Sequence, residues 1–202
     1  MAIIEVVSDV VCPWCFIGKR RLEKALALLG KQADTEIHWK PFQLNPNAPK
    51  EGMDRQEYRA RKFGSAARSK ELEDRVAAAG AEDGIHFRFD DIKRTPNTFD
   101  AHRLIWLAGQ AGDQNEVVEN LFQAYFLKGE DIGAPEVLIR IAKESGIEFP
   151  SENQGTKEVT AEEQNARRQG ISGVPSFFIG GNPITSGAHK PELLAQVLAP
   201  VL

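Results

Sequence analysis

The sequence predicts an α/β domain into which a long helical segment is inserted. Three observations lead to this fold class. A β-rich apolar run at residues 3–7 precedes an amphipathic helical pattern that begins at Pro13. Two further strand-like runs and a helical pattern close the chain. Between these two ends, residues 54–148 have an almost entirely helical pattern.

The first strand and the first helix flank the two cysteines of the chain. Residues 3–7 are typical of a buried strand, and residues 8–11 form a short connection. Gly30 is a suitable helix end. Apolar residues recur between these points at helical spacing, namely Cys15, Leu22, Ala25, Leu26 and Leu29.

A second strand and the first inserted helix follow. Residues 35–42 alternate in polarity as a strand does, and a connection rich in Pro and Asn covers 45–49. Asp54 with Glu57 is the pattern of a helix N-terminal cap. The charged helix that this cap opens is expected to end at Gly80.

The rest of the insertion is also predicted to be helical, apart from residues 85–96. That stretch is expected to be short, irregular or extended. The other helices are recognised by residues that favour helix starts and stops. We predict them from Asn97 or Thr98 through Ala108, from Asp113 with Glu116, from Pro135 to Gly146, and from Thr160 with Glu163 to Gly170.

The end of the chain predicts two strands and a helix, at 176–179, 183–186 and 191–198. Strand-helix-strand at the front with strand-strand-helix at the back is a thioredoxin-like order. We therefore predict a thioredoxin-like domain, residues 1–46 and 157–202, with a large all-helical insertion domain at 47–156.

Composition excludes several classes of protein. Of 202 residues, 42% are hydrophobic and 27% charged, which is ordinary for a globular protein. The net charge of −4 argues against nucleic acid as a partner. No apolar run is long enough for a membrane-spanning helix, and the first residues lack the pattern of a secretory signal. We expect a cytoplasmic protein that binds no membrane.

Cys12 and Cys15 carry the chemistry that the sequence predicts. A C-x-x-C pair is either a redox pair or half of a metal site, and no two histidines have zinc-finger spacing, so no metal is expected. Pro13 suits the first helical position, which puts Cys12 at a helix N-terminus. The positive charge there favours a thiolate, and Cys15 lies one turn on, where it can resolve a mixed disulfide.

Five segments together resemble a known family. They are Ser8–Gly18 around Cys-Pro-Trp-Cys, Pro41–Pro46, Asn97–Leu104, Gly173–Ile179 and Ser186–Ala188. This pattern resembles the FrnE-like cytosolic dithiol oxidoreductases of the DsbA family, within the thioredoxin-like superfamily. The resemblance spans nearly the whole chain.

The resemblance implies roles around the cysteines. It implies a cis peptide at Pro175 that faces Cys12, with Val174 offering backbone groups to an extended substrate. Pro13, Trp14 and Pro175 would support the active site. Trp14 is either part of the core or an exposed apolar platform for the substrate.

The expected activity is thiol–disulfide exchange, as an oxidoreductase or disulfide isomerase, through Cys12 and Cys15. No cofactor is needed, although glutathione is a possible redox partner. Expected partners are disulfide-containing proteins or small-molecule thiols, and glutathione or a thioredoxin-type reductant. The chain would be a monomer or homodimer. The Pro-Trp pair between the cysteines differs from that of periplasmic DsbA and of thioredoxin, so the reduction potential is left open.

Two other functions remain open. Kappa-class glutathione transferases and 2-hydroxychromene-2-carboxylate isomerases are similar in architecture, but they carry Ser where this chain has Cys12. A non-enzymatic holdase or zinc-binding protein is the other alternative.

Three further groups of residues receive structural interpretations. Asn97, Asp100 and His102 are interpreted as a helix cap, a surface acid and a satisfied histidine, with proton transfer near Cys15 as the alternative. The other two groups are an aromatic stripe expected in the core, Phe122, Tyr125 and Phe126, and a basic cluster expected on a solvated face, Arg55, Arg59, Arg61 and Lys62.

Overall fold

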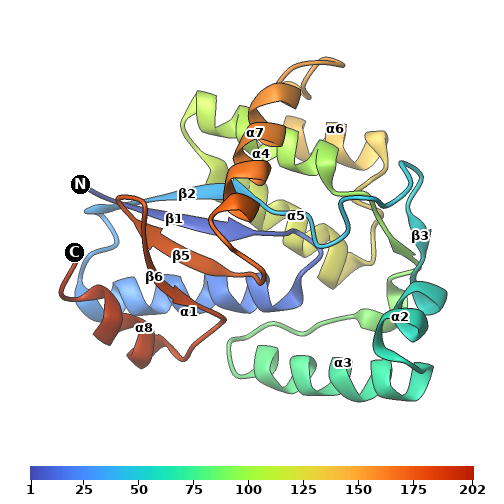
Figure 1. Cartoon of the computed structure of the whole chain (residues 1–202), viewed down its shortest axis with the longest axis horizontal. Coiled ribbons are helices and arrows are strands. Elements are labelled where there is room, and N and C mark those ends of the chain that lie inside the picture. Colours follow the sequence, from blue (N-terminus) through green and yellow to red (C-terminus); the bar gives the residue numbers. More distant parts are fainter.

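The computed structural model describes residues 1–202 and has a four-stranded sheet at its centre (Figure 1). The strand order is β2-β1-β5-β6, in which β1 runs parallel to β2 and antiparallel to β5, and β6 runs antiparallel to β5. Both ends of the chain therefore share one sheet, and the thioredoxin-like order is confirmed. The strands are β1 (Ala2–Ser8), β2 (Thr35–Pro41), β5 (Ser176–Ile179) and β6 (Asn182–Ser186).

Helices cover both faces of the sheet. In Figure 1, α1 and α8 lie side by side below the sheet, and α7 crosses its other face. No helix is both long and apolar enough to cross a membrane. The helices are α1 (Pro13–Leu29), α2 (Arg55–Phe63), α3 (Ala66–Ala81), α4 (Phe99–Ala111), α5 (Gln114–Lys128), α6 (Pro135–Glu144), α7 (Thr156–Arg168) and α8 (Pro191–Leu198).

The alternation of side chains along β1 explains why both faces are covered. Ile4 and Val6 face the larger core, which contains 34 buried residues. Val7 points the other way and packs with Ala166 of α7 and Phe178 of β5. Because successive strand residues point to opposite faces, an apolar run of this kind needs a helix on each side.

The segment between β2 and α7 holds the inserted helices, α2 to α6. It also contains a short antiparallel pair, β3 (Met53–Asp54) with β4 (Arg94–Thr95), and a 3₁₀ turn at Phe89–Asp91. The insertion is thus largely, not wholly, helical, and two-residue strands are too short to leave a pattern. We call α2–α6 with β3 and β4 the helical half, and the sheet with α1, α7 and α8 the sheet half. The domain bounds given above stay a prediction.

One predicted helix is two helices. The Asp54 carboxylate caps α2 as predicted, accepting from the Glu57 N–H at 2.9 Å. That helix does not continue to Gly80, because Gly64 (φ 90°) ends it and the Ser65 hydroxyl caps α3. Charged residues continue on both sides of the break, which is why the pattern predicted one helix.

Helix starts were predicted with mixed success. Asp113 caps α5 as expected, its carboxylate accepting from Asn115 and Glu116. The prediction that Thr160 opens α7 is wrong. The helix begins at Thr156, and the Thr160 hydroxyl donates to the Thr156 carbonyl at 2.7 Å. A threonine can make this bond inside a helix, so its presence alone does not mark a start.

The two halves share one core. Phe16 of α1 stacks on Phe122 of α5 with ring centroids 5.0 Å apart, and Phe87 meets Phe126 edge-on at 5.2 Å. The aromatic stripe of α5 is buried, as predicted. Packing of this kind makes the sheet half and the helical half a continuous apolar interior.

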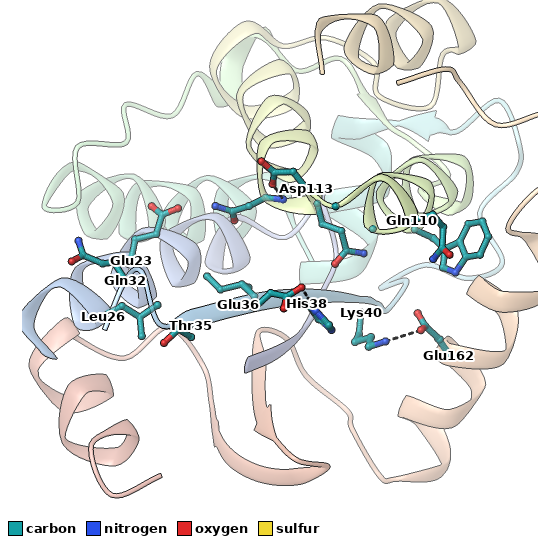
Figure 2. A pocket seen from close by; sticks show the side chains of 16 residues that line it. Glu23, Leu26, Gln32, Thr35, Glu36, His38, Lys40, Gln110, Asp113 and Glu162 are labelled. Carbon is teal, nitrogen blue, oxygen red and sulfur yellow. Dashed lines mark hydrogen bonds and ion pairs between the residues drawn. The ribbon is translucent and has the colours of Figure 1, made fainter. Parts of the chain in front are cut away.

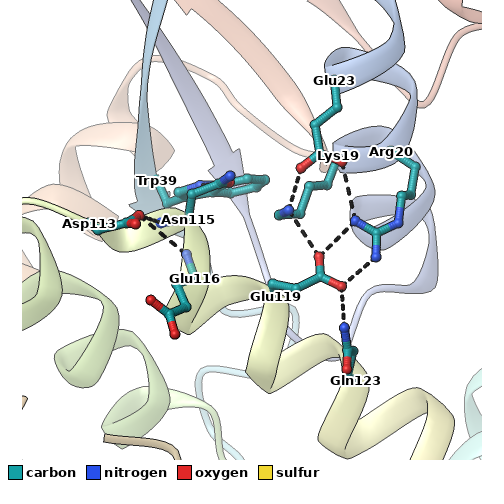
Figure 3. A network of polar contacts seen from close by, with 9 residues as sticks. All are labelled: Lys19, Arg20, Glu23, Trp39, Asp113, Asn115, Glu116, Glu119 and Gln123. Atoms are coloured by element: carbon teal, nitrogen blue, oxygen red, sulfur yellow. Dashed lines mark hydrogen bonds and ion pairs between the residues drawn. The ribbon is translucent and has the colours of Figure 1, made fainter. Parts of the chain in front are cut away.

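A polar joint beside these rings also links α1 to α5 (Figure 3). Glu119 accepts from the two terminal guanidinium nitrogens of Arg20, Nη1 and Nη2, and pairs with the buried Lys19 at 2.9 Å. Gln123 donates to the same carboxylate at 2.7 Å. Burial alone would raise the pKa of Glu119, but the hydrogen bonds from Arg20 and Gln123 and the charge of Lys19 hold it below its usual range.

Candidate active site

Cys12 and Cys15 lie at the start of α1, where β1 ends and the helix begins. Cys12 is the residue just before the first helical turn, with extended backbone, and Pro13 is the first helical residue. The Cys12 N–H donates to the Asp9 carbonyl at 3.0 Å, and the Cys15 N–H donates to the Cys12 carbonyl at 3.0 Å. Proline pre-sets the helical φ angle and lacks an N–H, so this start costs no backbone hydrogen bond.

The two thiols have different surroundings. Cys15 is fully buried, and burial, together with the neighbouring Cys12, raises the pKa of its thiol well above the ordinary value. Cys12 is on a cavity wall, and its thiol donates to the Val174 carbonyl at 3.7 Å. Both thiols are buried, but Cys12 is 6% exposed and borders the cavity, whereas Cys15 is fully buried and does not line it.

The loop before β5, which contains Val174 and Pro175, lies against the start of α1. The Val174–Pro175 peptide is cis, and Val174 faces Cys12, as the resemblance implied. A Cβ on Gly18 would lie 2.8 Å from the Pro175 ring, so only glycine lets α1 approach the loop this closely. The Val174 N–H makes no hydrogen bond within the chain.

Trp14 is not part of the core. Its side chain is 39% exposed, and it lies on the cavity wall with Pro13. Of the two interpretations above, the exposed position is the one observed. An exposed indole beside a reactive sulfur offers an apolar surface to a ligand.

The cavity at Cys12 has a volume of about 400 Å³ and lies between the two halves. The sheet half supplies the thiol side, and the helical half supplies the other walls. Three members of the predicted solvated basic cluster are in those walls, namely Arg55, Arg59 and Lys62. The solvated interpretation is wrong for Arg55, which is buried, and for Arg59, whose side chain is mostly covered, whereas Lys62 is exposed as predicted. Tyr58 and Phe63 are interleaved with these cations in the sequence, and that signal was missed.

Glu73 of α3 holds two of these cations. Its Oε1 lies 2.6 Å from Arg55 and 2.9 Å from Arg59. Tyr125 of α5 lines the cavity beside them, and burial raises the pKa of its hydroxyl to about 12. Part of the aromatic stripe is therefore also a cavity wall.

Asn97, Asp100 and His102 fit the structural interpretations. The Asn97 side-chain oxygen accepts from Phe99 at 3.0 Å, at the start of α4. Asp100 pairs with Arg103 at 2.8 Å and is partly exposed. His102 is buried, with its Nε2 3.2 Å from Asp9 Oδ1.

Asp9 is a site residue that sequence reasoning missed. It is fully buried directly before the Cys12 loop, and its other carboxylate oxygen accepts from the Leu44 N–H at 2.8 Å. With His102 on α4, it ties the loop that carries Cys12 to the helical half. Its partners lie 35 and 93 residues away, so no local pattern could have found them.

A second cavity lies along β2 and contains neither cysteine (Figure 2). Its volume is about 500 Å³, and polar side chains dominate its lining. They neutralise one another, as in the Lys40–Glu162 pair at 2.7 Å and the contact between His38 and Glu36 at 2.8 Å. Nothing in this second cavity resembles the mixture of thiol, rings and surplus cations at Cys12.

Comparisons with known proteins find similarity over nearly the whole chain. The chain is 28% identical to the uncharacterized protein YwbO of Bacillus subtilis over 93% of this chain and 91% of that one. It matches the crystal structure of the probable DsbA oxidoreductase SCO1869 from Streptomyces coelicolor with a TM-score of 0.89 at 28% identity, covering 99% and 89% of the two chains.

Two more distant structures share the fold. One is a 2-hydroxychromene-2-carboxylate isomerase, with a TM-score of 0.73, 14% identity and coverage of 98% and 95%. The other is the cytosolic disulfide reductase DsbM from Pseudomonas aeruginosa with GSH, with a TM-score of 0.58, 18% identity and coverage of 96% and 93%. The model of the DSBA-like thioredoxin domain matches residues 3–199, and the chain belongs to that family.

Proposed function

We propose that the protein is a thiol–disulfide oxidoreductase that exchanges disulfides at Cys12 and resolves them with Cys15. The observation that carries the proposal is that, of two thiols at one helix N-terminus, one lines a cavity and the other does not. Cys12 lines a cavity, whereas Cys15 is fully buried and holds its proton more tightly. This is the arrangement that a two-step exchange needs.

The exchange balances in two steps. The Cys12 thiolate attacks a substrate disulfide, so that a mixed disulfide forms and one substrate sulfur leaves as a thiol after protonation. The Cys15 thiol then loses its proton and attacks Cys12, forming the Cys12–Cys15 disulfide and releasing the second substrate thiol. Two electrons pass from the protein to the substrate. Two glutathione molecules, or a thioredoxin-type dithiol, return them.

The neighbouring groups have roles in this scheme. The unpaired Val174 N–H and its carbonyl, beside Cys12, suit an extended substrate that adds a short strand. Trp14 offers an apolar surface, and Pro13 and Pro175 keep the helix start and the loop in place. The motifs around Cys12 favour the FrnE-like branch of the family. A cytosolic location, the setting of DsbM, would favour the reductase or isomerase direction.

A redox titration in glutathione buffers tests the proposal. Free thiols are trapped at each ratio, and mass spectrometry gives the fraction of Cys12–Cys15 disulfide. A single two-electron transition is the expected result, and its midpoint gives the direction in the cell. If no intramolecular disulfide forms at any ratio, the proposed exchange does not occur.

Glutathione-dependent transfer is the second candidate, because cations beside Cys12 suit the carboxylates of glutathione. It predicts that a Cys12→Ser, Cys15→Ser double variant still binds glutathione saturably and still forms conjugates. Exchange at the cysteines predicts that this variant is inactive.

A further inference from the structure

The cavity at Cys12 carries more positive charge than its own carboxylate neutralises. Arg75 in its lining pairs with Glu71 at 2.6 Å, which leaves three cations, Arg55, Arg59 and Lys62, against the single carboxylate of Glu73. Both Arg55 and Arg59 pair with that one group. Lys62 makes no ion pair at all, and its ammonium donates instead to the Tyr58 hydroxyl at 2.7 Å. Surplus charge in a partly closed cavity attracts an anion.

Contacts within the chain fix the arginine side chains in the cavity wall. Arg59 donates to the Ser69 hydroxyl at 2.8 Å while it pairs with Glu73, and its guanidinium lies 4.7 Å from the centre of the Phe63 ring. Burial lowers the pKa of Arg59. Placing charge there is therefore costly, and a bound anion would offset part of the cost.

The rest of the lining is apolar and aromatic. Rings of Phe63, Phe89, Tyr125 and Phe126 face the same space as Trp14 and Cys12. The volume of about 400 Å³ lies in the range of small-molecule sites. A side chain or a small molecule fits this space, whereas a folded protein surface does not.

We propose that the cavity takes a low-molecular-weight disulfide with an aromatic or similarly apolar body and a carboxylate, which Arg59 and Lys62 recognise while the disulfide lies against Cys12. This inference rests on the proposed function and names its substrate class. Electrons balance as before: the Cys12 and Cys15 thiols become a disulfide, and the substrate disulfide becomes two thiols. A glutathione-type thiol regenerates the reduced protein.

Three disulfide probes separate the features of the cavity. Dithiobis(nitrobenzoate) is aromatic and carries carboxylates, dithiodipyridine is aromatic without carboxylates, and oxidised glutathione carries carboxylates on a polar body. Reduction of each is measured as kcat/KM, with glutathione and glutathione reductase as the recycling system, or with dithiothreitol where oxidised glutathione is the substrate.

Lys62→Gln is the first variant, because Lys62 is exposed, makes no ion pair and contacts only the neighbouring Tyr58 and Phe63. We expect kcat/KM for dithiobis(nitrobenzoate) to fall about tenfold, and about a hundredfold in the Arg59→Gln, Lys62→Gln double variant. Dithiodipyridine should change by less than about twofold. Lys40→Gln is the matched control, since Lys40 lines the second cavity (Figure 2).

Phe63→Ala tests the apolar part of the proposal. It should raise KM for dithiobis(nitrobenzoate) about fivefold and leave oxidised glutathione unchanged. Equal losses on all three probes would overturn the inference, because the cations would then act on Cys12 rather than on the substrate. No loss on any probe would also overturn it. Failure of the proposed function is distinct, because the wild-type protein would then reduce none of the probes and form no Cys12–Cys15 disulfide.

Discussion

The sheet half and the helical half contribute different things to the same cavity. The sheet half brings two sulfurs and the Val174 loop together at one helix end. The helical half brings rings and cations, of which Arg55 and Tyr125 are buried. The difference teaches that reactivity and selectivity can be separated in this chain. Variants of the sheet half should change the reaction rate for every substrate. Variants of the helical half should change which substrate is preferred.

Cys12→Ser should have the largest effect, because it removes the sulfur that the sheet half places on the cavity wall. We expect disulfide reduction to fall more than about a thousandfold for every probe. Cys15→Ser is the matched variant. It should still attack the substrate once and then stop as a mixed disulfide, which mass spectrometry detects as a covalent adduct on Cys12. Equal adduct formation by both variants would mean that Cys15 also attacks substrate.

Asp9→Ala tests the contacts that tie the Cys12 loop to Leu44 and His102. The substitution leaves the partly buried Leu44 N–H and the buried His102 without their partner. We expect a loss of about 3 kcal/mol in the free energy of unfolding, measured from urea transitions. Asp100→Ala is the control on α4, the helix that carries His102, because the pair of Asp100 with Arg103 is partly exposed, and it should cost less than about 1 kcal/mol.

The release step should depend on pH through Cys15. In the proposed exchange, the Cys15 thiolate releases a mixed disulfide from Cys12, and burial, the main cause, raises the pKa of Cys15 whether or not Cys12 is charged. Below that pKa, the rate should rise about tenfold per pH unit and continue to rise beyond pH of about 8.5, the ordinary thiol value. Stopped-flow release of nitrothiobenzoate measures it. A plateau reached at neutral pH would show that another group takes the proton from Cys15.

The fold was largely predictable because its strands and most helix ends carry local signals. Asp54, Asp113 and Gly30 act as the caps or stops that their residue types favour. The break at Gly64 was missed because the charge pattern continues across it. Thr160 was misassigned because a threonine makes similar hydrogen bonds inside a helix and at its start.

The candidate site was predictable only where its residues are neighbours in sequence. Cys12, Trp14 and Cys15 follow from one motif, and Val174 from the resemblance. The exposure of Arg55 and Arg59 was mispredicted, because the burial of a side chain depends on the residues that pack against it. Glu73 and Tyr125, which face Arg55 and Arg59, come from other helices of the insertion. No periodicity can distinguish a solvated face from a cavity wall in that case.

The smallest expected effect concerns the joint of Figure 3, where neither chemistry nor selectivity is involved. Glu119→Gln removes the charge that pairs with Lys19 and Arg20. We expect the free energy of unfolding to fall by about 1–2 kcal/mol at neutral pH, because the site is only partly buried.

The contribution of Glu119 should also depend on pH. Its folded-state pKa is depressed, so its contribution is present above the unfolded value of about 4.3 and is lost as pH falls through the folded value. The difference between wild type and variant in urea unfolding should therefore shrink as pH falls below about 4.3. Glu116→Gln, on the same helix but exposed and without an ion pair, should show no such difference at any pH. A Glu119→Gln loss that stayed constant down to low pH would mean that the carboxylate acts through its shape and hydrogen bonds, not through its charge.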